Sequence, residues 1–178
     1  MKKTSFITLF LFACLNGIAQ SGKQFPEMKI NTLDGKEMML PTSVKGKPTV
    51  ICLIYSQKTE KALETWLEPM WNTFVVKNPL NPEPYDVNMY FVMMLSGLKD
   101  AASDVITKRL KKSVNPQLQP YIVLYQGSLK TYLDELSFGK KDEPYFCIID
   151  KNGKILHSVV GFYSDEKMEE LESKLEAK

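Results

Sequence analysis

Residues 46–61 read Gly-Lys-Pro-Thr-Val-Ile-Cys-Leu-Ile-Tyr-Ser-Gln-Lys-Thr-Glu-Lys, and this stretch decides the fold. It contains a turn, a continuous apolar run from Thr49 to Tyr55, and a polar break that opens a helix. An apolar run that is rich in β-branched residues and lacks polar alternation predicts a strand covered on both faces, as in the centre of an α/β sheet. The junction of such a strand with the next helix is where α/β proteins place their chemistry. Here the junction has no cysteine, histidine or glycine-rich loop.

The other elements follow from hydrophobic periodicity and from turn residues. A β-hairpin is predicted around residues 33–36, Leu-Asp-Gly-Lys, and a second hairpin joins residues 145–149 to residues 154–160. Between and after them we expect a helix over 59–76, an irregular proline-rich loop over 78–84, a strand over 86–95, a helix that Ser96 caps and that ends before Asn115, a strand over 121–125, a helix over 128–136, and a last helix capped by Ser164. The order indicates an α/β fold with a central sheet flanked by helices.

The helix over 59–76 carries large apolar side chains at steps of three and four, which places them on one face. These residues are Leu63, Trp66, Leu67, Met70, Trp71 and Phe74. Pro69 lies off this stripe, so we expect it to kink the helix rather than end it. The spacing favours core packing over a ligand-binding box.

The chain has 178 residues, of which 44% are hydrophobic and 25% charged, as expected for one globular domain. Residues 1–19 read as a secretory signal, with two lysines, an apolar segment over 6–13 and a small-x-small cleavage site at 17–19. We therefore expect a single exported domain over 20–178, periplasmic or extracellular. Residues 11–14, Leu-Phe-Ala-Cys, also resemble a bacterial lipobox, in which case Cys14 is lipidated and holds the protein on a membrane.

The formal net charge is +2, and the predicted signal holds two lysines and no acids, so the remaining domain has a charge of 2 − 2 = 0. A neutral domain has no overall field that attracts nucleic acid, so we exclude that class of partner. Residues 108–112, Lys-Arg-Leu-Lys-Lys, end a predicted helix. Cations there complement the helix dipole, and an anionic partner is the alternative.

Two cysteines remain in the domain, Cys52 and Cys147, and both lie in apolar strand-like runs. We expect them to be buried and unreactive, because burial in apolar surroundings raises the pKa of a thiol. His157 is the one histidine and has no second ligand candidate at metal spacing, so it is expected at a surface or strand edge. The sequence predicts no metal and no cofactor.

Several short motifs together resemble exported thiol-disulfide reductases and peroxiredoxins of the thioredoxin-like superfamily. They are Phe-Pro at 25–26, Leu-Asp-Gly-Lys at 33–36, Gly-Lys-Pro at 46–48, the run over 143–155, and Gly161. The resemblance covers residues 25–175 and implies a thioredoxin-like fold, with a central mixed β-sheet flanked by helices and an N-terminal β-hairpin extension. Those families carry a Cys-x-x-Cys pair at the start of the helix after the central strand, and the matching positions here are Lys58 and Lys61. Lysine cannot exchange electrons with a dithiol, so the resemblance implies the scaffold without the reaction.

The resemblance also implies that the Glu143–Pro144 bond is cis and that the backbone beside it pairs with an extended polypeptide. We therefore expect a non-catalytic protein that binds a polypeptide in a crevice lined by Gln57, Lys58, Lys61, Glu143, Pro144 and Tyr145. Three alternatives stay open: Pro144 merely shapes a turn, Cys52 or Cys147 serves a thiol oxidoreductase or peroxidase of altered design, or the fold binds a small molecule.

A second resemblance is to the mitochondrial ATP synthase assembly factor family, which is thioredoxin-like and lacks the redox pair. It is carried by the helix with Trp66 and Pro69, by residues 110–125 and by residues 145–155. This resemblance implies a chaperone-type role on a membrane protein.

Overall fold

The computed structural model describes residues 21–76, 85–97, 100–137, 139 and 142–176. The predicted signal, the lipobox at Cys14 and the proline-rich loop over 78–84 lie outside these residues. The strands are β1 (Met28–Thr32), β2 (Glu37–Leu40), β3 (Thr49–Ile54), β4 (Asn88–Leu95), β5 (Ile122–Gln126), β6 (Tyr145–Ile149) and β7 (Ile155–Val160). The α-helices are α1 (Glu60–Phe74), α2 (Asp100–Ser113), α3 (Lys130–Glu135) and α4 (Asp165–Glu176).

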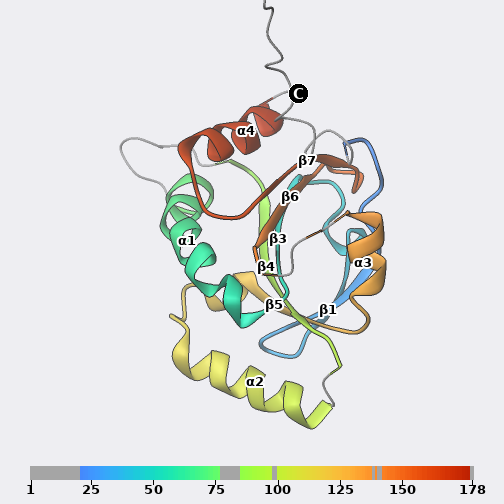
Figure 1. Ribbon diagram of the computed structural model, residues 1–178, viewed down its shortest axis with the longest axis vertical. Helices are drawn as coiled ribbons and strands as arrows, with labels where there is room; N and C mark the ends of the chain where they lie inside the picture. Colours follow the sequence, from blue (N-terminus) through green and yellow to red (C-terminus); the bar gives the residue numbers. More distant parts are fainter. Residues whose placement is uncertain (1–20, 77–84, 98–99, 138, 140–141, 177–178) are drawn as a thin grey trace, which may run out of the picture.

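The seven strands form one mixed sheet in the order β2-β1-β5-β4-β3-β6-β7 (Figure 1). β3, β4 and β5 run parallel, whereas β1 pairs antiparallel with β2 and β5, and β6 pairs antiparallel with β3 and β7. Two hairpins therefore flank a parallel centre that is built from strand-helix-strand units. This arrangement confirms the predicted α/β fold, with its mixed sheet and N-terminal hairpin.

The central strand β3 is buried at all six positions, as its unbroken apolar run predicts. Val50, Cys52 and Ile54 belong to the core on one face of the sheet, together with side chains of α1 and α4. Ile51 and Leu53 belong to the core on the other face, which α3 and the β1–β2 hairpin complete. Because successive side chains of a strand point to opposite faces, only a strand between two cores needs every residue to be apolar.

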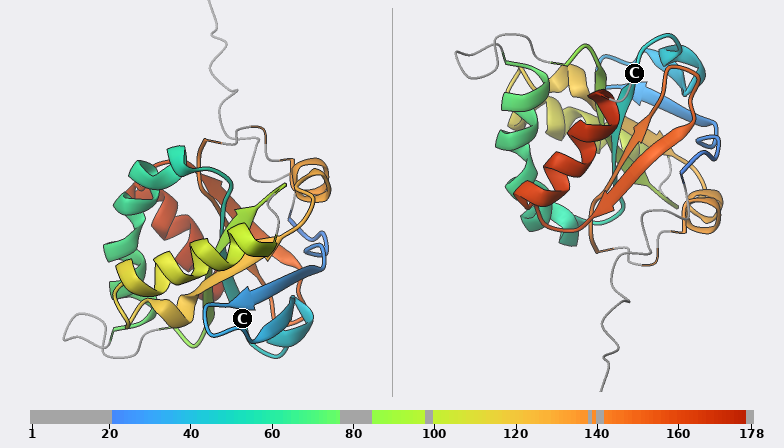
Figure 2. Two further views of the ribbon diagram at one scale, coloured as in Figure 1. Left: turned by 90° about the horizontal axis from the view of Figure 1, so that it is seen from below. Right: turned by 90° about the horizontal axis from the view of Figure 1, so that it is seen from above.

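Helices α1 and α4 lie side by side on one face of the sheet and α3 lies on the other (Figures 1 and 2). The predicted apolar stripe of α1 is confirmed at Trp66, Met70 and Phe74, which are buried, and Pro69 lies inside the helix. In α4 the inward residues are Met168, Leu171 and Leu175, and the Ser164 hydroxyl accepts a hydrogen bond from the Lys167 N–H. α3 is shorter than the predicted segment over 128–136.

Helix α2 differs from α1 and α4 in its packing. Of the side chains of α2 that the structure describes, 103–113, not one is fully buried; Ser103, Ile106, Thr107 and Leu110 are half-buried. The helix follows β4 and lies at the lower edge of the domain in Figure 1. Within the described ranges, each of the helices is too short or too polar to cross a membrane.

Candidate functional site

The junction between β3 and α1 is built around Ser56, the helix-capping residue that follows the buried strand. Its hydroxyl accepts a hydrogen bond from the Lys58 N–H at 3.0 Å, and its carbonyl accepts one from the Thr59 hydroxyl at 2.6 Å. These bonds form a 3₁₀ turn over Gln57–Thr59, which leads directly into α1. Thr59 is buried beneath the turn, whereas Gln57, Lys58 and Lys61 are exposed. The two lysines therefore present their ammonium groups to solvent at the start of the helix.

The segment before β6 is held against this junction by Asp142. One carboxylate oxygen of Asp142 lies 3.2 Å from the Lys58 Nζ, and the other accepts a hydrogen bond from the Ser56 hydroxyl at 3.3 Å. The Lys58 and Asp142 side chains are 76% and 56% exposed, so solvent screening limits the contribution of this ion pair to stability to about 0–1 kcal/mol. Its consequence is positional, because it places the exposed ammonium of Lys58 beside Asp142.

The six residues predicted to line the crevice divide into two groups. Gln57, Lys58 and Lys61 offer exposed side chains, and Glu143 is half-buried. Pro144 and Tyr145 are buried, and the Tyr145 ring makes an edge-to-face contact with Tyr55, the last residue of the apolar run, at 6.1 Å between centroids. Pro144 and Tyr145 therefore support the site from beneath and offer little surface to a partner.

The predicted cis bond at Glu143–Pro144 is not found. Among the described residues the cis peptide bond joins Leu40 and Pro41 instead. The two isomers of an X-Pro bond differ by only about 0.5–1 kcal/mol, so the surrounding structure rather than the dipeptide sequence decides which one forms.

A third segment, the bend after β7, completes the site and was missed by the sequence reasoning. The Gly161 N–H donates to the Pro144 carbonyl at 3.0 Å, and the Gly161 carbonyl accepts from the Trp66 indole N–H at 2.8 Å. Gly161 has φ +89°, a conformation that favours glycine. The Lys167 ammonium donates hydrogen bonds to the carbonyls of Val160 and Phe162, the residues on either side of Gly161. The bend is thus tied to α1, to Pro144 just before β6, and to α4, and it exposes 57% of Phe162.

Asp142 and Phe162 were missed for the same reason. Each lies in a short loop. The contacts that place these loops in the site, Asp142 with Lys58 and Gly161 with Trp66, join residues that are far apart in the sequence. The loop glycine Gly161, which the resemblance singled out, was the available signal for the bend.

The two cysteines are buried as predicted, but they do not face each other. β3 and β6 are neighbours, and their register sets Cys52 opposite Phe146 and Cys147 opposite Ile51. The two thiols consequently lie in the cores on opposite faces of the sheet. Burial raises the pKa of Cys147 to about 12, and burial together with the negative charge of an ionised Cys147 raises the pKa of Cys52. Both residues are free thiols that cannot form a disulfide with each other in this register.

His157 lies on β7, an edge strand, as predicted, with Nε2 at 2.8 Å from a carboxylate oxygen of Glu170 in α4. In the part of the chain that the structure describes, no three His, Cys, Asp or Glu side chains converge in a way that would hold a metal ion.

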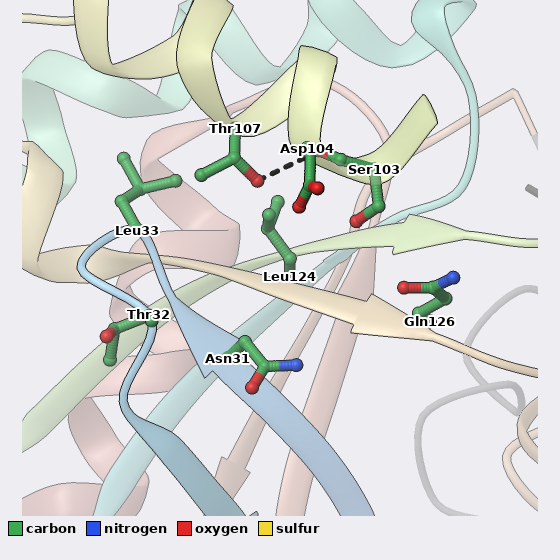
Figure 3. A pocket seen from close by; sticks show the side chains of 9 residues that line it. Asn31, Thr32, Leu33, Ser103, Asp104, Thr107, Leu124 and Gln126 are labelled. Atoms are coloured by element: carbon green, nitrogen blue, oxygen red, sulfur yellow. Dashed lines mark hydrogen bonds between the residues drawn. The ribbon is translucent and has the colours of Figure 1, made fainter. Parts of the chain in front are cut away.

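A separate hollow of about 290 Å³ lies between α2 and the strands β1 and β5 (Figure 3). Asn31, Leu124 and Gln126 line it from the strands, and Ser103, Asp104 and Thr107 line it from the helix. The Thr107 hydroxyl is already bonded to the Ser103 carbonyl at 2.9 Å. None of the six predicted crevice residues contributes to this hollow.

Several thiol-disulfide proteins are among the solved structures that resemble this fold. The pneumococcal exposed lipoprotein thioredoxin from Streptococcus pneumoniae is 18% identical, with a TM-score of 0.54 over 84% of this chain and 98% of its own. A thio-disulfide isomerase from Thermus thermophilus is 16% identical, with a TM-score of 0.53 over 89% and 98%. The thioredoxin domain of a thiol-disulfide oxidoreductase from Bacteroides vulgatus is 14% identical, with a TM-score of 0.51 over 87% and 97%. At these identities the likeness establishes a thioredoxin-like fold and nothing further.

A comparison with curated proteins gives no match. A family model described as ATP10 protein, in contrast, matches residues 18–176, nearly the whole chain. This match agrees with the second resemblance drawn from the sequence. The chain therefore has a thioredoxin-like fold and belongs to the ATP10 protein family.

Proposed function

We propose that this protein is an exported thioredoxin-fold module without redox cysteines, which binds a polypeptide and acts as an assembly factor or chaperone on a membrane protein. The observation that carries the proposal is the pair Lys58 and Lys61 at the two positions where a thioredoxin-like oxidoreductase holds its cysteines. Membership of the ATP10 protein family supports it, since the resemblance to ATP synthase assembly factors implies such a role.

The chemistry of the junction supports binding rather than electron transfer. Disulfide exchange needs a thiolate, which the start of a helix stabilises, whereas an ammonium group is unfavourable there. The Asp142 carboxylate offsets the charge of Lys58 at 3.2 Å. The two cysteines of the domain are buried, and their pKa values are raised, so neither thiol supplies a nucleophile at neutral pH.

The surface at this site suits an extended polypeptide. Gln57 offers an amide for hydrogen bonds, and Lys61 offers a cation for a carboxylate. Phe162, which is 57% exposed on the bend after β7, offers an apolar contact. Exposed polar groups and an exposed aromatic ring, on segments that meet at one site, suit the recognition of a peptide without chemistry.

The proposed location is outside the cytoplasm. The support is the predicted signal over residues 1–19, together with the pneumococcal relative, which is itself an exposed lipoprotein. Lipidation at Cys14 would add an anchor on the membrane.

Site-specific photo-crosslinking in the native cell tests the proposal. A photoreactive residue is placed at Gln57 at the junction, and, as a matched control, at Lys151, which is exposed in the turn between β6 and β7 at the other end of β3. We expect one discrete protein adduct from position 57 and none from position 151. Equal labelling from both positions would contradict a partner site at the junction.

The thiol alternative is tested on the same protein. Replacing Cys52 and Cys147 with alanine should leave the adduct from position 57 unchanged, and the native thiols should resist alkylation at pH 8. A rapidly alkylated cysteine, or loss of the adduct in the double variant with a native circular dichroism spectrum, would favour a thiol enzyme of altered design.

A further inference from the structure

Helix α2 carries a cationic stripe on its outward face. Val105, Lys108, Arg109 and Lys112 are spaced by three and four residues, so they share one side of the helix, and all four are exposed. Val105 is 66% exposed. The half-buried residues Ser103, Ile106, Thr107 and Leu110 lie on the opposite side, toward the sheet. We call Val105, Lys108, Arg109 and Lys112 the α2 stripe.

The described part of the protein neutralises the charges of the α2 stripe only in part. Lys111, on the flank of the helix, pairs with Asp34 in the β1–β2 turn at 3.3 Å. Lys108, Arg109 and Lys112, in contrast, form no salt bridge with any described side chain. Their position in the second half of the helix complements its dipole, but this requires no alignment on one face. Three aligned cations that form no salt bridge with a described side chain make a local positive surface, which the exposed Asp104, one helical turn before Lys108, offsets in part. The net charge of the chain is only +2.

We propose that the α2 stripe binds the surface of an anionic lipid bilayer. Long cationic side chains on the outward face of a helix match the diffuse negative charge of a lipid surface. Val105, which is exposed beside them, gives an apolar contact that the boundary between headgroups and acyl chains accommodates. An acidic protein is the competing partner. A protein interface normally has a buried centre with an apolar pocket or an aromatic anchor, and fixed carboxylates would meet the cations around that centre.

This inference goes beyond the proposed function, because the client crevice lies at the β3–α1 junction and the lipid contact lies on α2. Different residues form the two surfaces. A module that works on a membrane protein would gain from such a contact, since it holds the crevice near its client.

Vesicle flotation tests the α2 stripe. The chain from Gln20 onward contains every described residue and lacks Cys14, so an attached lipid cannot explain binding. The probes are vesicles of phosphatidylcholine alone and vesicles in which about 40% of the lipid is phosphatidylglycerol, an anionic lipid. The test variant is K108Q/R109Q/K112Q, because glutamine keeps helix propensity and removes the charge. The matched control is K23Q/K45Q/K151Q, which removes three exposed cations from loops elsewhere.

Each lysine or arginine near an anionic surface contributes about fivefold in binding, so losing three should weaken binding by about 100-fold. At low salt we expect the unmodified chain and the loop control to float with the anionic vesicles and not with those of phosphatidylcholine alone. Added salt should release both proteins from the vesicles. The α2 variant should stay unbound while keeping its thermal melting temperature.

Two results would overturn the inference: equal losses in the two triple variants, or no flotation of the unmodified chain with anionic vesicles at low salt. Retention on polyglutamate without flotation would also overturn it, in favour of an acidic protein partner. Photo-crosslinking from position 57 is read independently, so a failure of the lipid contact is distinguishable from a failure of the client crevice.

Discussion

Replacing Trp66 with phenylalanine tests whether the bend after β7 is held in place by α1. The Trp66 side chain is fully buried, and its indole N–H donates to the Gly161 carbonyl at 2.8 Å. Its ring lies 4.2 Å from that of Phe146 and 5.3 Å from that of Tyr163, measured between centroids. Phenylalanine keeps an aromatic ring between these neighbours but removes the donor and part of the volume.

The expected cost has two parts. A buried carbonyl that loses its hydrogen-bond donor costs about 1–3 kcal/mol. The smaller ring leaves a space whose transfer and cavity terms add about 1 kcal/mol or more. We therefore expect Trp66→Phe to lower the free energy of unfolding by about 2–4 kcal/mol, a large part of the 5–15 kcal/mol typical of a domain. Trp71→Phe is the matched control, because Trp71 is half-buried and its ring contact is an edge-to-face one with Tyr121 at 5.9 Å.

Urea unfolding followed by far-ultraviolet circular dichroism measures both variants without relying on tryptophan fluorescence. The control should lose less than about 1 kcal/mol, since a half-exposed ring leaves no buried carbonyl unpaired. A Trp66 variant within about 0.5 kcal/mol of the unmodified protein, or a control that loses as much as it, would refute the assignment of the Trp66–Gly161 bond as the support of the site.

Three further predictions concern the site and the buried thiols. Lys58→Cys combined with Lys61→Cys should create a dithiol that reduces insulin disulfides, because the start of α1 stabilises a thiolate; a folded double variant without a reactive dithiol would mean that the junction is misplaced. Burial raises the pKa of Cys147 from about 9 to about 12, so the folded state keeps a proton that the unfolded chain loses, and the stability that this thiol contributes is present below pH 9 and lost as the pH rises toward 12. The difference in unfolding free energy between the unmodified protein and Cys147→Ala should therefore shrink over that range in alkaline urea titrations, and a constant difference would contradict it. Gly161→Ala should cost roughly 1–2 kcal/mol in the same assay, since φ is +89° there, and an unchanged midpoint would show that the bend relaxes freely.

Local pattern was sufficient wherever one residue's neighbours in sequence are also its neighbours in space. The unbroken apolar run predicted β3, the three- and four-residue spacing predicted the buried face of α1, and the Asp-Gly turn predicted the β1–β2 hairpin. The position of Lys58 and Lys61 at the start of a helix also follows from this local pattern. Strand and helix periods act over a few residues, so the printed sequence contains that information directly.

The site itself depends on pairings that local pattern does not encode. Asp142 reaches Lys58 across 84 residues of sequence, and Gly161 reaches Trp66 across 95. Two loops and a helix start have to be brought to one end of the sheet before these contacts exist. The resemblance implied that Glu143 and Pro144 lie there, but the sequence does not show that Pro144 is buried or that its bond to Glu143 is not cis.

By itself, the sequence determined that this protein has an α/β fold with a buried central strand, and its resemblance to thioredoxin-like reductases predicts lysines at the positions of their redox pair. Only the tertiary structure decided that Cys52 and Cys147 lie on opposite faces of the sheet and that the bend at Gly161 joins the site. The physical reason is strand register: a shift of one residue between β3 and β6 would turn every side chain of a strand to the other face, and register is set by the packing of both cores together.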